Sequence, residues 1–222
     1  MENAMPSPRT QYIHALRFSS LTSLYDPLIA LTGRERHVKE TLLTIARLQP
    51  GHSVLDVGCG TGTLAVMAAR KVPAIALHGL DGDAEILRRA ALKAAEAGVG
   101  LRLSHAMSDR MPYEGKLFDR VLSSLFFHHL RMDSKRATLR EMLRVLKPGG
   151  ELVIGDLGKP QNALMRVLSL TTQFLDGFET TRGNVQGALP RLMREVGFAE
   201  VAVARQIPTF YGTVAIYRGI RP

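Results

Sequence analysis

The sequence predicts an α/β protein with a mostly parallel seven-stranded sheet, helices on both faces and a terminal antiparallel β-hairpin. In the middle of the chain, strand-like and helix-like segments alternate, which is typical of parallel strands joined by crossover helices. After the last helical segment, two strand-like segments follow each other with no helix between them, and a hairpin is the economical connection. The ordinary dinucleotide-binding fold would instead continue with crossover helices.

Five short segments are the expected parallel strands, at residues 53–57, 75–80, 101–103, 118–123 and 152–154. Helices are expected between them, at 64–71 and where apolar residues recur at helical spacing, as in Leu87, Ala90, Ala91 and Ala94 and again in Leu139, Met142, Leu143 and Leu146. Gly98 should end the second of these helices. Pro148-Gly149-Gly150 should stop the third, because proline lacks an amide hydrogen and glycine tolerates positive φ.

The last quarter of the chain holds one more helix and the hairpin. The helix is predicted by the spacing of Leu189, Leu192, Met193 and Val196, and Gly197 should cap it. The hairpin strands are expected at 200–204 and 213–217.

Two further segments are expected to cover the carboxyl ends of the strands, where ligands of open α/β sheets bind. Residues 1–49 form an N-terminal helical cover, with one helix face made of Val38, Thr41, Leu42 and Ile45. Residues 158–186 form a lid insertion, in which an apolar side serves either as a lid over an apolar ligand or as core packing; its members are Leu164, Val167, Leu168 and Leu175. With a cofactor-binding core at 50–157 and the last helix and hairpin at 187–222, we expect a single domain.

The composition indicates a globular protein without an internal disulfide, because Cys59 is the one cysteine of the 222 residues. The sequence shows no apolar run long enough to span a membrane and no signal peptide, so a cytoplasmic setting is expected. The net charge of +9 favours acidic partners such as nucleic acid, anionic lipid or anionic metabolites. The densest basic stretch, 131–147, is interpreted as a solvated helix face without interleaved aromatic residues.

The segment 54–62 is the most informative part of the chain. Gly58, Gly60 and Gly62 remove side chains where the backbone must turn sharply and approach a ligand. The helix that follows presents free amide hydrogens at its start. This G-x-G-x-G arrangement therefore predicts a ligand-binding loop between the first strand and the first helix.

Two acidic residues specify the ligand. Asp81 lies 19 residues after Gly62, at the end of the second expected strand, where a carboxylate can accept hydrogen bonds from both hydroxyls of a ribose. Asp56 lies two residues before the first glycine, where it would repel a pyrophosphate but can help to hold an ammonium group. An aminoacyl sulfonium cofactor fits this pair better than NAD does.

The stretch from about residue 50 to 156 resembles the class I S-adenosylmethionine-dependent methyltransferases, which have a Rossmann-like fold. It is most similar to the small-molecule branch that includes ubiquinone/menaquinone C-methyltransferases (type 11 methyltransferase-like). The resemblance rests on the glycine loop and on Met111-Pro112-Tyr113 with 118–121, His128-His129-Leu130, the segment 144–150, Gly197-Phe198 with 210–212, and Tyr25-Asp26-Pro27. It implies S-adenosylmethionine as cofactor and leaves the acceptor open.

The resemblance also implies which residues contact the cofactor. Gly58, Cys59, Gly60 and Gly62 would provide backbone contacts, and Asp81 would contact the ribose. Ser124 or its neighbour would present backbone to the methionine part, and an N-terminal Tyr25 would fold over the cofactor. The remaining expected cofactor-binding residues are Asp56, Thr61, Gly82, Met107 and Ser108.

One position departs from the family pattern. The family shows Gly-Asp-Ala at the end of the third strand, where the acid contacts the adenine amino group, and this chain has Ala106-Met107-Ser108. Met107 cannot accept that hydrogen bond in the same way. Asp109, backbone groups or apolar contact with adenine are the alternatives.

The expected catalytic residues follow the fourth and fifth strands. Methyl transfer is an in-line displacement that depends on orientation, and a hydroxyl or enol acceptor also needs a general base. His128 and His129 are candidates for this base, and Asp156 is a further one. In the alternative interpretation, one histidine packs beneath the cofactor and the other faces solvent.

A small-molecule acceptor, apolar or quinone-like, is the favoured substrate class. The alternatives are a nucleic-acid (tRNA or rRNA) methyltransferase, suggested by the charge, and a non-enzymatic S-adenosylmethionine-binding protein. The sequence argues against nucleic acid, because it has neither an aromatic base-clamping motif nor a second cysteine. No metal-ligand constellation is apparent, and both a monomer and a homodimer remain open.

Overall fold

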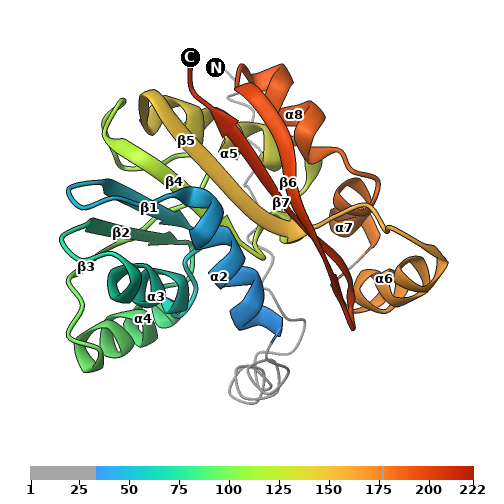
Figure 1. Cartoon of the computed structure of the whole chain (residues 1–222), viewed down its shortest axis with the longest axis horizontal. Helices are drawn as coiled ribbons and strands as arrows, with labels where there is room; N and C mark the ends of the chain where they lie inside the picture. The colour runs from blue at the N-terminus through green and yellow to red at the C-terminus, as the bar shows by residue number, and fades with distance from the viewer. Residues whose placement is uncertain (1–33, 177) are drawn as a thin grey trace, which may run out of the picture.

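The computed structural model describes residues 34–176 and 178–222, which form a seven-stranded sheet flanked by helices (Figure 1). Strands β1 to β5 are parallel, and β7 and β6 add an antiparallel hairpin at one edge. The order across the sheet is β3-β2-β1-β4-β5-β7-β6. The predicted fold class is therefore confirmed, including the terminal hairpin.

The first strand has the predicted bounds, the second is shifted by one residue, and the other five are longer than predicted. They are β1 (Ser53–Val57), β2 (Ala76–Asp81), β3 (Leu101–His105), β4 (Phe118–Ser124), β5 (Leu146–Leu157), β6 (Ala199–Thr209) and β7 (Gly212–Ile220). Strand β1 pairs with β2 on one side and with β4 on the other. Their carboxyl ends therefore flank the point where the strand order reverses, which is where open α/β sheets bind ligands.

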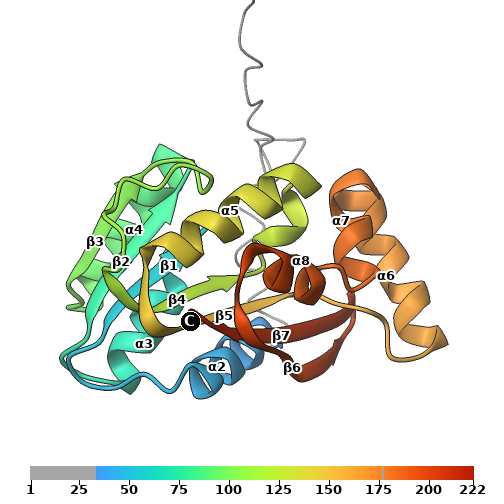
Figure 2. The ribbon, with the colours of Figure 1, turned by 90° about the horizontal axis from the view of Figure 1, so that it is seen from above.

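Two hydrophobic clusters hold the helices to opposite faces of the sheet (Figure 2). Helices α5 (Met132–Val145) and α8 (Leu189–Val196) pack on one face. Helices α2 (Arg34–Ala46) and α3 (Thr63–Lys71) pack on the other, and α4 (Ala84–Glu96) lies beside α3. The predicted alternation of strands and crossover helices is thus present on both faces.

Of the predicted N-terminal cover at 1–49, the part that the structure describes is helix α2, and this part is placed differently from the prediction. Val38 and Leu42 of α2 are buried as expected, but they pack against the face of the sheet and not over its carboxyl ends. Val38 and Leu42 lie close to Gly155 of β5, and Arg120 at the start of β4 donates to the carbonyl of Ala46 at the helix end. Helix α2 therefore runs along the strands as a layer of the core.

The predicted stop of α5 at Pro148 is also wrong by a few residues. The helix ends at Val145, and Leu146 already has extended backbone angles and begins β5. The ring of Pro148 disfavours helical angles at Lys147, and Arg221 donates to the carbonyls of Leu143 and Arg144 at the helix end. Both effects terminate the helix before the proline.

The predicted lid consists of two helices. They are α6 (Ala163–Asp176) and α7 (Phe178–Val185), which pack on each other. Helix α7 contacts the short 3-10 helix η2 (Phe127–His129) that follows β4, and α6 contacts β7. Within the described part of the chain, no helix has the length and apolar character needed to cross a membrane.

Candidate functional site

The glycine loop connects the end of β1 to the start of α3. Gly58, Gly60 and Gly62 all have positive φ, at 69°, 52° and 74°, which side chains rarely adopt. The amides of Gly58 and Cys59 both donate to the carbonyl of Leu80, at 2.8 and 3.1 Å, so the loop folds back onto β2. A side chain at Gly60 would meet no atom within 4 Å, so space is open above this residue. The loop therefore leaves room for a ligand at its centre.

Gly58 also connects the loop to the predicted histidine pair. A Cβ atom at Gly58 would come within 2.4 Å of the ring of Phe126, which precedes η2. Leu125 reaches this position with a φ of 54°, a strained value for a branched residue. The tight turn after β4 thus brings η2 against the glycine loop.

Asp81 holds the loop from the end of β2. Its carboxylate accepts from the amide of Gly60 at 3.0 Å and from the amide of Asp83 at 3.0 Å. Burial raises the pKa of Asp81, and these amide donors oppose the rise. Asp83 caps α4 by accepting from the amides of Glu85 and Ile86, as expected for a helix cap.

Asp56 is a buried carboxylate without a hydrogen-bond partner among the described residues. It is 3% exposed, and neither of its oxygens is bonded there. Burial raises its pKa to about 7, Lys39 opposes this, and Asp81 adds to it. A buried carboxylate of this kind is costly unless a cation or donor approaches it. The ammonium group of S-adenosylmethionine fits this requirement, so the residues present fit the predicted cofactor.

Ser124 shows the same feature at the end of β4. Its buried hydroxyl oxygen has no partner among the described residues, and its strand neighbour is Gly155 of β5. The hydroxyl and the Asp56 carboxylate both belong to the carboxyl-end half of adjacent strands. The predicted backbone contact of Ser124 or its neighbour with the methionine part of the cofactor stays a prediction, and the buried hydroxyl is an additional polar group at the same place.

Cys59 is a structural residue of the loop. Its side chain is buried, and its sulfur lies against Gly79 of β2, where a Cβ atom would come within 2.9 Å. Burial raises the pKa of the Cys59 thiol, and Asp56 and Asp81 raise it further. The thiol is therefore protonated at neutral pH and is no nucleophile.

Three of the other predicted cofactor residues direct polar groups elsewhere. The Thr61 hydroxyl lies 2.8 Å from the Lys93 ammonium, and the Gly82 carbonyl lies 3.1 Å from a ring nitrogen of His105. The Ser108 hydroxyl is 2.8 Å from the hydroxyl of Thr138 in α5, so its side chain joins the segment after β3 to α5. Their side chains or carbonyls thus support the site, and only their remaining backbone groups are left for cofactor contact.

Met107 follows β3, and its apolar side chain is 38% exposed; its contact with adenine stays a prediction. Tyr25 lies outside the described residues.

The catalytic prediction converges on Asp156, at the end of β5. Its carboxylate is fully buried and accepts from His128 Nδ1 at 3.0 Å, from the amide of Phe127 at 2.7 Å and from the amide of Leu157 at 2.7 Å. Asn184 of α7 donates to it as well, at 2.8 Å. Burial acts to raise the pKa of Asp156, but His128 and the other donors hold it below its usual value. Asp156 is therefore an ionised partner of His128 and is too deeply buried to act directly on an acceptor.

The two histidines differ in their surroundings. Their ring centroids are 3.9 Å apart, and only His128 has a hydrogen bond to Asp156 among the contacts described. Burial lowers the pKa of His129 to about 3, and His128 lowers it further, so the ring of His129 is neutral and a weak base. A carboxylate on Nδ1 of His128 fixes the tautomer and makes Nε2 its basic nitrogen.

Two residues of the site were not predicted from the sequence. Asn184 is 1% exposed, and its carbonyl oxygen has no partner in the described part of the chain. Lys135 is 1% exposed and donates to the carbonyls of Leu130 and Thr180, at 2.8 and 2.6 Å. Burial lowers the pKa of Lys135 to about 8. Lys135 thus ties α5 to α7, and the interruption of an apolar helix face by a lysine was the available signal.

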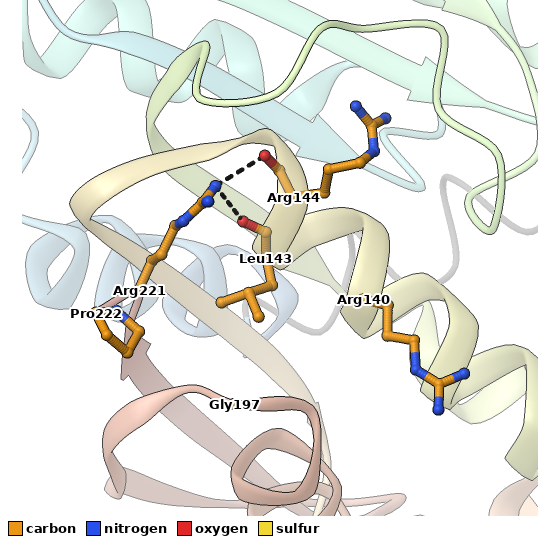
Figure 3. A pocket seen from close by; sticks show the side chains of 6 residues that line it. All are labelled: Arg140, Leu143, Arg144, Gly197, Arg221 and Pro222. Carbon is orange, nitrogen blue, oxygen red and sulfur yellow. Dashed lines mark hydrogen bonds between the residues drawn. The ribbon is translucent and has the colours of Figure 1, made fainter.

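A hollow of about 390 Å³ lies elsewhere, at the opposite ends of the strands (Figure 3). Arg140, Arg144 and Arg221 line it, but the side chains of Arg140 and Arg144 point away from Arg221. Arg221 bonds to helix carbonyls, and Arg144 is paired with Glu141 at 2.7 Å. This hollow has no convergent polar groups and is separate from the candidate site.

The family model described as a methyltransferase domain matches residues 54–150, which include the glycine loop, Asp56, Asp81 and both histidines. The chain belongs to the class I S-adenosylmethionine-dependent methyltransferases, and S-adenosylmethionine is the cofactor of this class. The predicted recognition and cofactor are therefore confirmed at the level of the family.

The chain is similar to several named proteins. The demethylmenaquinone methyltransferase of Listeria monocytogenes is 31% identical over 160 residues, which cover 70% of this chain and 66% of that protein. The ubiquinone/menaquinone biosynthesis C-methyltransferase of Pseudomonas fluorescens is 27% identical over 228 residues, or 92% of this chain and 87% of that protein. Among solved structures, the cyclase SpnF matches with a TM-score of 0.67 at 22% identity, covering 85% of this chain and 81% of that one. The last likeness shows the fold alone.

Proposed function

We propose that the chain transfers the methyl group of S-adenosylmethionine to a small, apolar, quinone-like acceptor, with His128 as the general base. The observation that carries the proposal is the bond between His128 Nδ1 and the buried Asp156 carboxylate, placed beside the glycine loop through Phe126. The acceptor class comes from the names of the relatives, which act in menaquinone and ubiquinone synthesis.

S-adenosylmethionine supplies an electrophilic methyl group whose leaving group is a neutral thioether. The residues of this chain then have three tasks. Asp56 holds the ammonium end of the cofactor, and Asp81 positions the glycine loop and takes the ribose hydroxyls. His128 removes the proton of an acceptor hydroxyl, which makes an aromatic carbon or oxygen a better nucleophile. Asp156 stabilises the imidazolium that forms.

The alternative of a nucleic-acid acceptor finds little support in the densest basic stretch. Arg136, Arg144 and Lys147 are paired with Glu195, Glu141 and Asp119, and Lys135 is buried. These cations are already engaged within the described structure. They do not form the free basic face that phosphate contacts require.

The experiment combines cofactor binding with turnover. Calorimetry should show that S-adenosylmethionine and S-adenosylhomocysteine bind and that NAD does not. A demethylated naphthoquinol and labelled S-adenosylmethionine then give the turnover of the wild type, His128→Gln and His129→Gln. We expect His128→Gln to lower kcat about 100-fold or more and His129→Gln to have a smaller effect.

The two variants separate catalysis from binding. Cofactor affinity should stay near the wild-type value in His128→Gln, because its ring is held by Asp156 and not by the glycine loop. Unchanged turnover of His128→Gln over the whole pH range would exclude the base. Cofactor binding without turnover on any acceptor would instead support a non-enzymatic S-adenosylmethionine-binding protein.

A further inference from the structure

Helix α6 exposes an apolar face. Leu164, Val167 and Leu170 follow each other at intervals of three residues and are 63%, 60% and 50% exposed. Met165 and Ser169, on the opposite side of the helix, are buried. Of the two alternatives that the sequence left open for this apolar side, core packing does not apply to Leu164 and Val167, because neither lies under a described part of the protein.

The turn between β6 and β7 lies beside α6 and carries a further exposed apolar residue. Phe210 in the turn is 51% exposed, and Gly212 packs so closely on Ser169 of α6 that a Cβ atom there would come within 3.1 Å of it. Figure 1 shows α6 beside the end of the hairpin, at one end of the molecule. We call Leu164, Val167, Leu170 and Phe210 the α6–turn surface. Single exposed apolar residues are ordinary, but a group on neighbouring elements marks an interaction surface.

The two sequence segments that carry the residues of the α6–turn surface contain charges of one sign. The two segments that form it, 157–170 and 201–214, contain Lys159, Arg166 and Arg205 and no aspartate or glutamate. All three basic residues are exposed. Large apolar side chains bordered by lysine and arginine fit the interface of a bilayer that contains anionic lipid. A second copy of the chain fits less well, because a symmetric pair would bring like charges together.

We propose that the α6–turn surface docks the protein on an anionic lipid surface. The apolar side chains enter the acyl boundary, and the three basic residues contact the lipid phosphates. Helix α6 packs on α7, whose Asn184 bonds to Asp156, so docking brings the acceptor side of the site next to the lipid. The consequence that a lipid-dissolved acceptor is delivered to His128 rests on the proposed function, whereas docking itself does not.

The test measures co-sedimentation of the full chain with vesicles, without cofactor or acceptor. One set contains phosphatidylcholine alone, and the other contains equal amounts of phosphatidylcholine and phosphatidylglycerol. We compare the wild type with Leu164→Asp/Val167→Asp. The matched control is Leu92→Asp, because Leu92 is an equally exposed apolar residue (65%) on the distant helix α4. Circular dichroism and thermal unfolding confirm that each variant is folded, and calorimetry separately measures its binding of S-adenosylmethionine.

The proposal expects binding to the mixed vesicles, little binding to phosphatidylcholine alone, and weaker binding at high salt. The double variant should bind about tenfold less, and Leu92→Asp should bind like the wild type. No binding to the mixed vesicles, or equal losses in both variants, would overturn it. So would a wild-type dimer that becomes a monomer in the double variant. Vesicle binding by a chain that does not bind S-adenosylmethionine would sink the proposed function and leave the docking intact.

Discussion

The two halves of the site differ in how completely they satisfy their own polar groups. In the cofactor half, the buried Asp56 has no bonded partner among the described residues. In the acceptor half, the equally buried Asp156 accepts from two amides, from His128 and from Asn184. A buried carboxylate that lacks donors marks a place where a ligand must supply them, and a saturated one marks a protein group that positions others.

The pKa values of the two carboxyl groups show the same contrast. Burial raises the pKa of Asp56 to about 7, whereas the donors around Asp156 outweigh burial and lower its pKa. Two residues of one type, on the strands β1 and β5 that flank β4, are thus shifted in opposite directions by the presence or absence of hydrogen-bond donors. The following variants test whether this contrast separates binding from catalysis.

The largest effect is expected for Asp156→Asn. The substitution replaces one accepting oxygen by an NH2 group, which then faces hydrogen-bond donors without being able to accept from them. The free energy of unfolding should therefore fall by about 3 kcal/mol or more. Turnover should fall about 100-fold or more because His128 loses the carboxylate that fixes its tautomer. Urea unfolding and labelled-methyl turnover measure the two effects. Asn184→Leu removes only one of the donors to Asp156 and should have smaller effects on stability and turnover. Wild-type turnover in Asp156→Asn would show that the acceptor half has another base.

Asp56→Asn should affect cofactor binding and its pH dependence. The folded pKa of about 7 lies above the unfolded value, so the folded state binds more protons between these values, and wild-type stability falls as pH rises from about 4 to 7. The total loss is roughly 4 kcal/mol at most. Asp56→Asn should lack this slope and be more stable than the wild type at neutral pH without cofactor.

Cofactor affinity should show the opposite trend with pH. Ionised Asp56 attracts the ammonium group, so the wild type should bind S-adenosylmethionine about tenfold more tightly at pH 8 than at pH 6. Asp56→Asn should bind more weakly and with little pH dependence. Calorimetry at the two pH values measures this difference. A pH-independent affinity in the wild type would mean that Asp56 does not contact the ammonium group.

The sequence indicates the groups of the cofactor half more directly than the contacts of the acceptor half, and the reason is the distance along the chain. Gly58, Gly60 and Gly62 must have positive φ, which restricts the residue type, and Asp56 lies within the same short segment. The network around Asp156 instead joins segments from η2, β5 and α7, about thirty residues apart, whose contacts depend on packing.

Boundaries set by tertiary contacts were also missed. The end of α5 depends on Arg221, 76 positions after Val145, and the exposure of Leu164 and Val167 depends on which side of α6 meets β7. Periodicity predicts that a helix has an apolar side, but it does not say which partner covers that side. The hairpin was accessible because the missing crossover helix is itself visible in the sequence.

The smallest effects on turnover and cofactor binding are expected for substitutions of two lysines, one beside each half of the site. Lys135 ties α5 to α7, and Lys93 contacts the hydroxyls of Thr61 and Thr63 beside the glycine loop, at 2.8 and 2.9 Å. Lys135→Met should lower turnover up to about tenfold with unchanged cofactor affinity, because the carbonyls of Leu130 and Thr180 lose their donor and α7 loosens. Hydrogen exchange in α7 should increase.

Lys93→Met is the matched variant, and it should weaken cofactor binding without affecting exchange in α7. The pH dependence separates the two as well. The pKa of Lys135 is about 8 in the folded state and about 10.4 when unfolded, so the unfolded chain binds more protons between these values, and wild-type stability rises with pH there. Lys135→Met should lack this rise, and Lys93→Met should keep it. If both variants changed binding and turnover alike, the two halves would be one cooperative unit.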